Sequence, residues 1–172
     1  MSTAIINKVS ESGLITLDLS TFLSKENIVA FDLKDYLFME LILKEKDFRS
    51  ALLEKDWGEY EKKIVCIYCS SDAIIPVWAY MLASTYIQPI SKEVYFGNPN
   101  QIKETILLNN INRVLVDDYI DKRIVIKGCG GEAIPESAYV AITNRLLPVA
   151  KSIMYGEPCS TVPVYKKKSS KI

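Results

Sequence analysis

The stretch Ile64–Ile87, "IVCIYCSSDAIIPVWAYMLASTYI", carries the pattern that predicts the fold of this chain. Its first six residues are a short apolar run, as in a buried strand, and the apolar segment after Pro76 has the length of a helix. Proline favours the first turn of a helix, where the amide hydrogen that it lacks would have no partner. The stretch therefore predicts a buried strand, a turn and a helix that begins near Pro76.

A similar phrase, "RIVIKGCGGEAIPESAYVAITNRLL", returns over Arg123–Leu147. Residues 63–100 can be aligned with residues 123–159 when one gap is placed opposite Ile74. This alignment pairs residues of the same type or charge, namely Cys69 with Cys129, Asp72 with Glu132, Pro76 with Pro135 and Tyr80 with Tyr139. We interpret the two segments as a duplicated β-α-β unit, with an accidental similarity of composition as the alternative.

The segments around the repeat extend this alternation. Short apolar runs predict strands over 14–19, 93–97 and 152–156, and helical spacing predicts a helix over 101–111. Strands that alternate with helices are typical of a parallel sheet built from β-α-β units. We therefore expect one α/β domain over residues 1–172, with a mainly parallel, Rossmann-like sheet.

The two ends of the chain are expected to differ from the middle. Residues 1–60 are expected to form an N-terminal layer, in which the segment "FDLKDYLFMEL" is a helix with Asp32 as its N-cap and a second helix covers 47–57. Residues 41–46 fit either a helix or a strand. The lysine-rich residues 164–172 are expected to be a frayed, basic tail.

Composition excludes several classes of function. The chain has 172 residues, no histidine, four cysteines and a formal net charge of zero. The absence of histidine excludes Ser-His-Asp triads and histidine-based metal sites. The balanced charge gives no reason to expect nucleic acid or an anionic membrane as a partner. No signal peptide or membrane-spanning run is seen, so we expect a cytoplasmic protein with reduced thiols.

Three of the cysteines follow predicted strands. Cys69 and Cys129 stand at the carboxyl ends of the two repeated strands, and Cys159 follows the last predicted strand. Because ligand sites of open parallel sheets lie at this edge, the three thiols are expected to converge on one pocket. Three thiolates could bind an iron–sulfur cluster or zinc and leave one coordination position open. The alternatives are reactive thiols without a metal and inert packing, and packing is our interpretation of Cys66, which lies inside its strand.

The turns after the two strands also suggest a site for an anion. Ser70, Ser71, Gly130 and Gly131 lie in these turns, where the free backbone amides of a helix N-terminus favour negative charge. A small enzyme for an anionic metabolite, such as a sugar phosphate, could draw its acid–base groups from nearby residues, namely Asp72, Glu132, Tyr80, Tyr139 and Lys127. Each of them also has a structural interpretation, as a first-turn or strand-end residue or as a core aromatic. A third hypothesis is a module that binds a partner protein and performs no chemistry.

Several phrases resemble those of a known family, among them "GLITLDL", "CSSDAIIPVWAYML", "KGC" and "VAKSIMYGEPCSTVPVYKK". In these phrases the chain resembles an uncharacterised family of Bacteroidetes proteins, a domain of unknown function. The resemblance implies genes that lie near sulfur-mobilisation genes for iron–sulfur assembly, and it also implies a suggested phosphosugar isomerase activity. It brings no catalytic residues to this chain.

The sequence therefore favours an accessory protein of iron–sulfur cluster assembly or sulfur metabolism. Cys69, Cys129 and Cys159 would hold a cluster or a metal ion, with Asp72 and Glu132 lining the same pocket. Iron–sulfur assembly proteins are the partners that this hypothesis expects. The sequence leaves the oligomeric state open, and it does not decide whether the protein is an enzyme.

Overall fold

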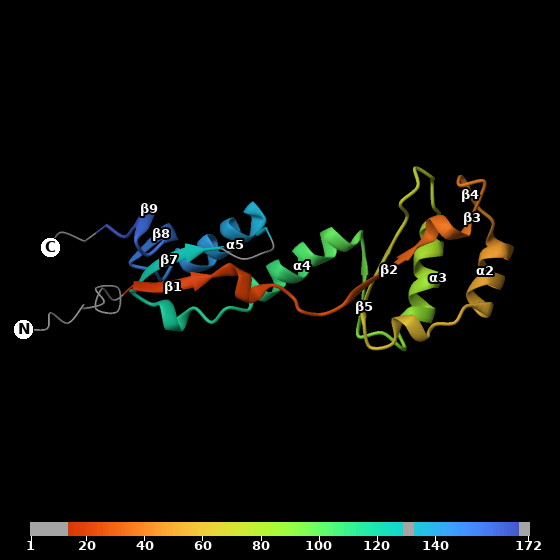
Figure 1. Ribbon diagram of the computed structural model, residues 1–172, viewed down its shortest axis with the longest axis horizontal. Coiled ribbons are helices and arrows are strands. Elements are labelled where there is room, and N and C mark those ends of the chain that lie inside the picture. Colours follow the sequence, from red (N-terminus) through yellow and green to blue (C-terminus); the bar gives the residue numbers. More distant parts are fainter. Residues whose placement is uncertain (1–13, 129–132, 169–172) are drawn as a thin grey trace, which may run out of the picture. The chain divides into compact units, whose positions relative to one another are not determined.

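The computed structural model describes residues 14–128 and 133–168, which fold into two compact units (Figure 1). Unit 1 comprises residues 1–23 and 106–172, and unit 2 comprises residues 24–105. Each unit contains helices and parallel strands, which confirms the α/β class. The described strands form two larger sheets and a small hairpin, in place of the single sheet that the sequence predicted.

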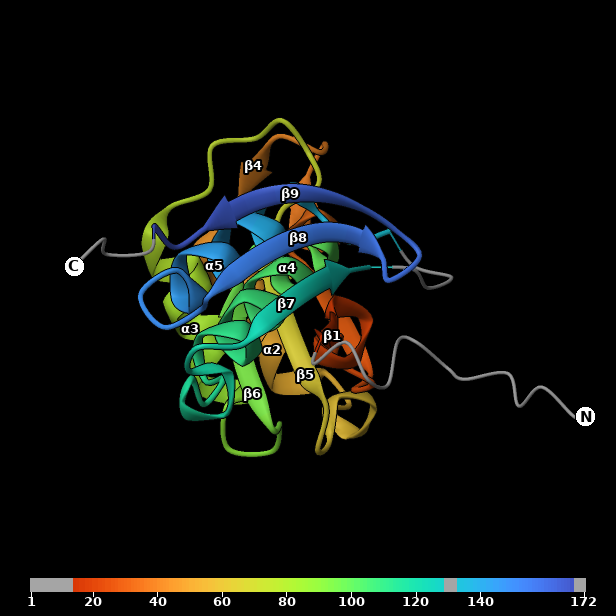
Figure 2. The ribbon, with the colours of Figure 1, turned by 90° about the vertical axis from the view of Figure 1, so that its left-hand side faces the viewer.

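Unit 1 contains a four-stranded sheet in the order β1-β7-β8-β9 (Figure 2). Its strands are β1 (Leu14–Asp18), β7 (Arg123–Lys127), β8 (Ser152–Glu157) and β9 (Ser160–Lys166). The first three are parallel, and β9 returns antiparallel to β8. The sequence did not predict β9. Its last residues, 164–166, form a strand where a frayed tail was expected over 164–172. Its apolar pattern is interrupted by Pro163, which lies at an irregularity of the pairing where proline is tolerated.

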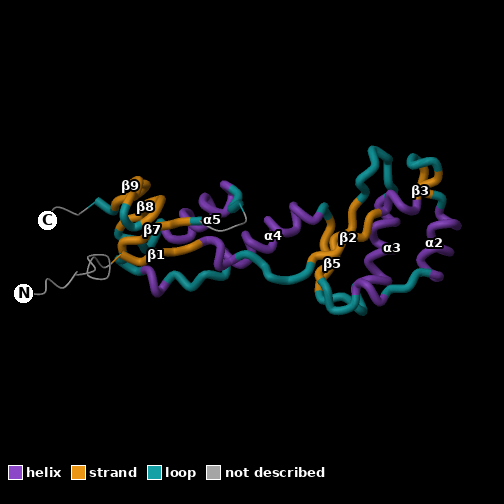
Figure 3. The backbone as a smooth tube through the Cα atoms, viewed as in Figure 1, coloured by secondary structure: helices purple, strands orange, loops and turns teal. Residues whose placement is uncertain are grey.

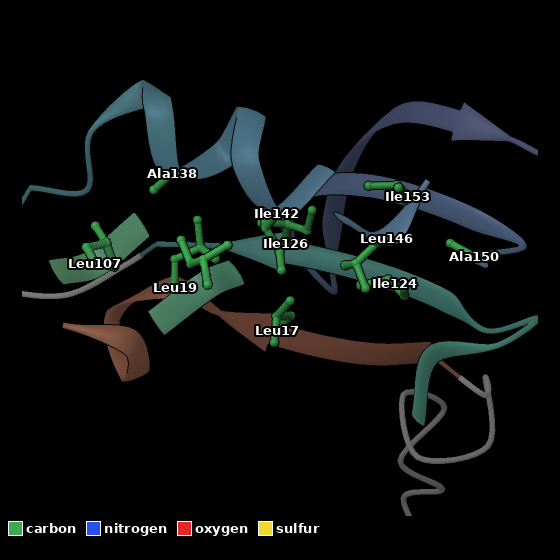
Figure 4. Packing of buried hydrophobic residues seen from close by; sticks show 11 residues of the cluster. Leu17, Leu19, Leu107, Ile124, Ile126, Ala138, Ile142, Leu146, Ala150 and Ile153 are labelled. Carbon is green, nitrogen blue, oxygen red and sulfur yellow. The ribbon is translucent and has the colours of Figure 1, made fainter. Parts of the chain in front are cut away.

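Helix α5 (Glu136–Leu146) packs on one face of this sheet and closes the core of unit 1 (Figure 4). Apolar residues recur every four positions along α5, so they share one side of the helix. Helix α4 (Pro99–Asn112) begins in unit 2, and its second half adds Leu107 and Ile111 to this core. Figure 4 also labels Ala138, Ile142 and Leu146 of α5, Leu17, Ile124, Ile126 and Ile153 of the strands, and Leu19 and Ala150 outside these elements.

Unit 2 contains a three-stranded parallel sheet in the order β2-β5-β6. Its strands are β2 (Ile28–Asp32), β5 (Ile64–Tyr68) and β6 (Glu93–Phe96). Helix α3 (Val77–Ile87) contacts β5 and β6, and helix α2 (Glu45–Glu54) lies beyond it (Figure 3). The rings of Phe48 and Trp78 join the two helices, with 6.2 Å between their centroids. The N-terminal layer expected over residues 1–60 is thus divided, because β1 and β2 belong to different sheets.

The segment "FDLKDYLFMEL" is not the helix that the sequence predicted. Its start lies in β2, and a short 3-10 helix (Leu33–Tyr36) follows, capped by Asp32 as expected. The chain then forms a hairpin from β3 (Leu37–Phe38) and β4 (Ile42–Leu43). Residues 41–46 are therefore strand first and helix afterwards, because α2 begins at Glu45.

Several backbone hydrogen bonds within unit 2 have a counterpart within unit 1, 59 residues further along the chain. The amide of Lys62 donates to the carbonyl of Ile90, and the amide of Asp121 donates in the same way to the carbonyl of Val149. Lys62 and Asp121 also share the left-handed backbone conformation, with φ of 57° and 54°. Three more amide-to-carbonyl hydrogen bonds recur in this way. In unit 2 they are Lys92–Lys63, Ala79–Pro76 and Gln88–Ser84, and in unit 1 they are Lys151–Lys122, Ala138–Pro135 and Leu147–Thr143. Each unit therefore has a strand, a helix and a strand whose backbone hydrogen bonds recur at this interval.

Candidate functional site

The predicted convergence of three cysteines at one sheet edge is not found. Cys69 follows β5 in the sheet of unit 2 and is half-buried, whereas Cys159 is exposed in the turn between β8 and β9 of unit 1. Cys129 lies outside the described residues, as do Gly130, Gly131 and Glu132. Within residues 14–128 and 133–168, no three His, Cys, Asp or Glu side chains are grouped as metal ligands would be.

Cys66 is a core residue, as the sequence predicted. Its side chain is fully buried in the middle of β5, and its Sγ donates to the carbonyl of Val29 at 3.5 Å. Burial raises the pKa of the Cys66 thiol, because the buried thiolate would lose its solvation. Cys66 is therefore an inert packing residue at neutral pH.

The described backbone contacts favour another alignment of the two segments that the sequence predicted to be a repeat. Lys63 and Tyr68 match Lys122 and Lys127 at an interval of 59, and Pro76 matches Pro135 at the same interval. The two intervening segments have equal length, so no gap is needed opposite Ile74. In this register Cys69 stands opposite Gly128, and the pairing of Cys69 with Cys129 is lost. The recurrence of a cysteine after each strand is therefore not a matched pair of sites.

Asp32 organises the carboxyl edge of the sheet in unit 2. Its Oδ1 accepts hydrogen bonds from the backbone amide of Lys34 at 2.9 Å and from that of Ser70 at 3.0 Å. Partial burial by itself raises the pKa of Asp32, but the hydrogen bonds from Ser70 and Lys34 outweigh it and hold this pKa below its ordinary value. The amide of Ser70, which we had expected to be open to an anion, already has a carboxylate partner.

The rest of the turn after β5 is also held by its own protein. The Ser71 hydroxyl donates to the carbonyl of Glu40 at 2.8 Å, and Cys69 Sγ lies 3.6 Å from the carbonyl of Ser71. Asp72 is exposed at the tip of the turn. These contacts join the turn to the hairpin of β3 and β4, so Ser70 and Ser71 have structural roles here.

Tyr80 lies near Cys69 and Asp32, as a residue of α3 that faces the strand ends. Burial raises the pKa of Tyr80, and negative charge on Cys69 and Asp32 would raise it further. The phenol therefore stays protonated at neutral pH, which does not suit a general base. Its ring packs edge-on against Phe96, with 5.1 Å between the centroids.

The equivalent edge of unit 1 is charged. Lys127 Nζ lies 3.6 Å from Asp18 Oδ2 and 3.6 Å from Glu157 Oε2, so three neighbouring strands contribute one cation and two carboxylates. The Ser20 hydroxyl and amide donate to Asp18 Oδ1 at 2.7 and 2.9 Å, and these bonds, with a smaller contribution from Lys127, lower the pKa of Asp18. The charges at this edge therefore satisfy one another.

Gly128 and Tyr139 are in close contact beside this charged edge. A Cβ atom on Gly128 would meet the Tyr139 hydroxyl and come within 3.0 Å of Ile134 Cγ1, so only glycine fits there without a shift. The ring of Tyr139 packs edge-on against Tyr155, with centroids 5.6 Å apart. Outside these rings a hollow of about 690 Å³ lies between α5 and strands β8 and β9.

The balanced charge of the chain does not extend to the face of unit 1 at the other end of its strands. A hollow of about 1320 Å³ is bounded there by Leu14, Met154, Pro163 and Tyr165, together with six charged residues, namely Asp121, Arg123, Lys151, Lys166, Lys167 and Lys168. None of the four lysines forms an ion pair with a described residue. This face is therefore locally basic, which the net charge of zero conceals.

Unit 2 exposes many large apolar side chains around the turn after β5 and around the hairpin of β3 and β4. The backbones of this turn and this hairpin lie side by side (Figures 1 and 2). The Ser71–Glu40 hydrogen bond joins the turn to the hairpin, and the Tyr80–Phe96 ring contact joins α3 to β6. Exposure reaches 96% for Ile74, 77% for Met39 and 73% for Phe96. We call this surface the apolar rim, which consists of Phe38, Met39, Leu41, Ile42, Ile74, Val77, Met81 and Phe96.

Sequence reasoning predicted the cap at Asp32 but missed its counterpart at Asp18, and it also missed the apolar rim. Asp18 and Asp32 have the same role, because each ends a strand and caps the 3-10 helix that follows. The repeated Asp-Leu step in "LDLSTF" and "FDLKDY" could have shown this, and it would have identified β2. The apolar rim had no comparable signal, because Met39 and Ile74 look like core residues in the sequence.

These features define a mixed α/β protein whose described strands form two larger sheets and a hairpin. The chain belongs to the family described as Protein of unknown function (DUF2480), whose model matches residues 3–167. This match confirms the resemblance to a family without a known function. No curated protein and no solved structure matches the chain. Among the described residues, no helix combines the length and the apolar character needed to cross a membrane.

Proposed function

We propose that this chain is a protein-binding module and that the apolar rim of unit 2 is its binding surface. The observation that carries the proposal is the exposure of the rim, with Met39, Ile74 and Phe96 each more than two-thirds exposed. Covering a large apolar side chain contributes about 1.5–3 kcal/mol. Large apolar side chains gathered on an exposed surface are typical of protein interaction sites.

The tip of the hairpin supports this proposal independently. Met39 and Glu40 both adopt left-handed backbone conformations, with φ of 50° and 59°. Successive residues with positive φ in a turn favour asparagine and glycine, and other residues there cost about 1–2 kcal/mol each. The chain nevertheless places a methionine at the tip, where it is exposed. Strain that persists in this way is typical of functional surfaces.

The proposal includes a duplicated β-α-β unit, of which the two copies have diverged. The backbone hydrogen bonds at an interval of 59 residues and the matching strand registers support a duplication. In unit 1 the copy has a charged edge and a fourth strand. In unit 2 it has the apolar rim, so binding is assigned to unit 2 alone.

Site-specific crosslinking tests the binding surface. A photo-crosslinking amino acid is placed at Met39 or at Ile74, and the matched control carries it at Leu53, which is 73% exposed at the far end of α2. In cells of the source organism, we expect discrete crosslinked products from positions 39 and 74 and none from position 53. Equal labelling at all three positions, or none at any, would contradict the proposal.

Iron–sulfur or zinc binding is a second candidate, favoured by the order of strands in unit 1. Cys129 and Cys159 each come two residues after the end of a strand, and these strands, β7 and β8, are parallel neighbours. Two thiols could therefore serve one metal site, without Cys69. Iron, sulfide and zinc analysis of protein purified without oxygen tests this, with Cys159→Ser beside the wild type and Cys69→Ser as the control. Metal that survives Cys159→Ser, or a wild type without metal after reconstitution, would exclude the candidate.

A further inference from the structure

The edges of β6 and β8 are closely similar. The pairing of β6 with β5 begins with Glu93 opposite Ile64, and the pairing of β8 with β7 begins with Ser152 opposite Arg123. The residues of the second pair lie 59 positions after those of the first, as do the hydrogen bonds described above. Each strand reaches a glycine with positive φ, which is 135° at Gly97 and 118° at Gly156. The aromatic contacts on the neighbouring helices match as well, with Tyr80–Phe96 in unit 2 and Tyr139–Tyr155 in unit 1.

The neighbours of the two strands differ. β8 lies between β7 and β9, whereas β6 is the last strand of its sheet among the described residues. In unit 1, Val162 of β9 pairs opposite Tyr155, which is 51% exposed. The equivalent Phe96 of β6 is 73% exposed. The place that β9 fills in unit 1 has no described strand in unit 2.

The backbone of β6 offers hydrogen bonds at this edge. The amide of Gly97 donates to the carbonyl of Ile67 on β5, so it points into the sheet. Successive residues of a strand point their amides and carbonyls in opposite directions. The amides and carbonyls of Phe96 and Val94 therefore point away from β5. An added strand can pair with them, and it would cover Phe96 at the same time.

We propose that the outer edge of β6 binds an extended strand of the partner protein, antiparallel to β6, in the place that β9 takes on β8. This proposal rests on the proposed function and gives its mode of binding, which is the addition of a strand to a sheet edge. The strand continues the apolar rim, because Phe96 belongs to both surfaces.

The pairing of β8 with β9 specifies the chemistry of this strand. Val162 stands opposite Tyr155, and Lys166 stands opposite Ser152. Their counterparts on β6 are Phe96 and the exposed Glu93, so the bound strand carries a β-branched residue opposite Phe96 and a cation opposite Glu93. Opposite charges across a strand pair are attractive, and β-branched residues pack well on aromatic rings. The bound strand therefore has an apolar residue near one end and a basic residue four positions further along.

The sequence of β9 itself meets these requirements and provides the probe. A synthetic peptide, STVPVYKK, is titrated into the full-length protein labelled with ¹⁵N, and backbone amide shifts and hydrogen exchange are followed by NMR. We expect saturable shifts and slowed exchange at Val94 and Phe96. Saturation without change at these two amides, or no saturation at all, would overturn the proposal.

A charge exchange tests the register. Glu93→Lys in the protein is expected to weaken binding of the peptide roughly fivefold, and the peptide variant Lys166→Glu is expected to restore it. Glu54→Lys, on the exposed face of α2, is the matched control and should leave binding unchanged. Equal weakening by both protein variants, or a failure of the exchange to restore binding, would contradict the register.

The same experiments separate the two proposals. Crosslinks from Met39 and Ile74, together with unchanged amides at Val94 and Phe96, would overturn the strand site and leave the protein-binding proposal in place. Shifts at these amides without any crosslink would retain the strand site and overturn the role of the hairpin tip. The absence of both results would overturn both proposals.

Discussion

Unit 1 and unit 2 use the same connections between strands and helices, yet they finish their sheets differently. Unit 1 adds β9 to the edge of β8 and brings Lys127 between two carboxylates at the strand ends. Unit 2 has Tyr68 at the position of Lys127, no described strand beyond β6, and an apolar rim. The two units therefore have similar connections between strands and helices, and their sheet edges distinguish them.

The largest effect is expected from matched core substitutions. Leu19 and Leu33 each follow a capping aspartate and are fully buried, one in each unit. Leu19→Ala and Leu33→Ala should each lower the free energy of unfolding by about 2–5 kcal/mol, because each leaves a cavity. Hydrogen exchange read by mass spectrometry should show faster exchange within the substituted unit. Equal acceleration in both units after either change would show that they unfold together, and the comparison would fail.

The contact of Gly128 with Tyr139 should give the next largest effect. Gly128→Ala places a methyl group against the Tyr139 hydroxyl and Ile134, and the overpacking should cost about 1–3 kcal/mol. At the matching position of unit 2, Cys69→Ala removes only a half-buried sulfur atom and should cost less. Urea denaturation of the two variants measures the difference. A smaller loss for Gly128→Ala than for Cys69→Ala would show that the two edges are not equivalent in packing.

Removal of the capping aspartates should have an intermediate and pH-dependent effect. Asp18→Ala and Asp32→Ala should each cost about 0.5–2 kcal/mol at pH 7, because each carboxylate accepts backbone hydrogen bonds. Both pKa values are lowered in the folded state from an ordinary 3.8, so the carboxylates stabilise the fold above that pH and lose this contribution as the pH falls through their folded pKa values. Urea denaturation should therefore show a smaller difference in the free energy of unfolding between each variant and the wild type at acid pH than at pH 7. A constant difference at every pH would exclude a role for the charge.

Much of this framework could be predicted from the sequence, for a local reason. The strands around Ile64 and Arg123 are short apolar runs, and the helices begin directly after Pro76 and Pro135, which are their N-cap residues. Which strands become neighbours is not a local property. β1 and β2 each pair with one of two similar central strands, so a single sheet and two sheets fit the same pattern of residues.

The edges could not be predicted in the same way. Met39, Ile74 and Phe96 are as apolar as core residues, and only the folded arrangement shows that they are exposed. The expectation of a shared cysteine site rested in part on one misplaced gap, which paired Cys69 with Cys129. The sequence did predict that Cys66 is buried, because it lies inside a strand, but it gave no sign that Cys159 is exposed.

The smallest effect is expected at the charged edge of unit 1. Lys127 lies 3.6 Å from both Asp18 and Glu157, but all three side chains are partly exposed, so water and salt weaken the attraction. Lys127→Gln should therefore lower stability by less than about 1 kcal/mol at low salt, and the difference should vanish at high salt. Tyr68→Phe, at the matching position of unit 2, should show no such dependence on salt. Urea denaturation at two salt concentrations measures this, and a loss with Lys127→Gln that persists at high salt would contradict a purely electrostatic role for the lysine.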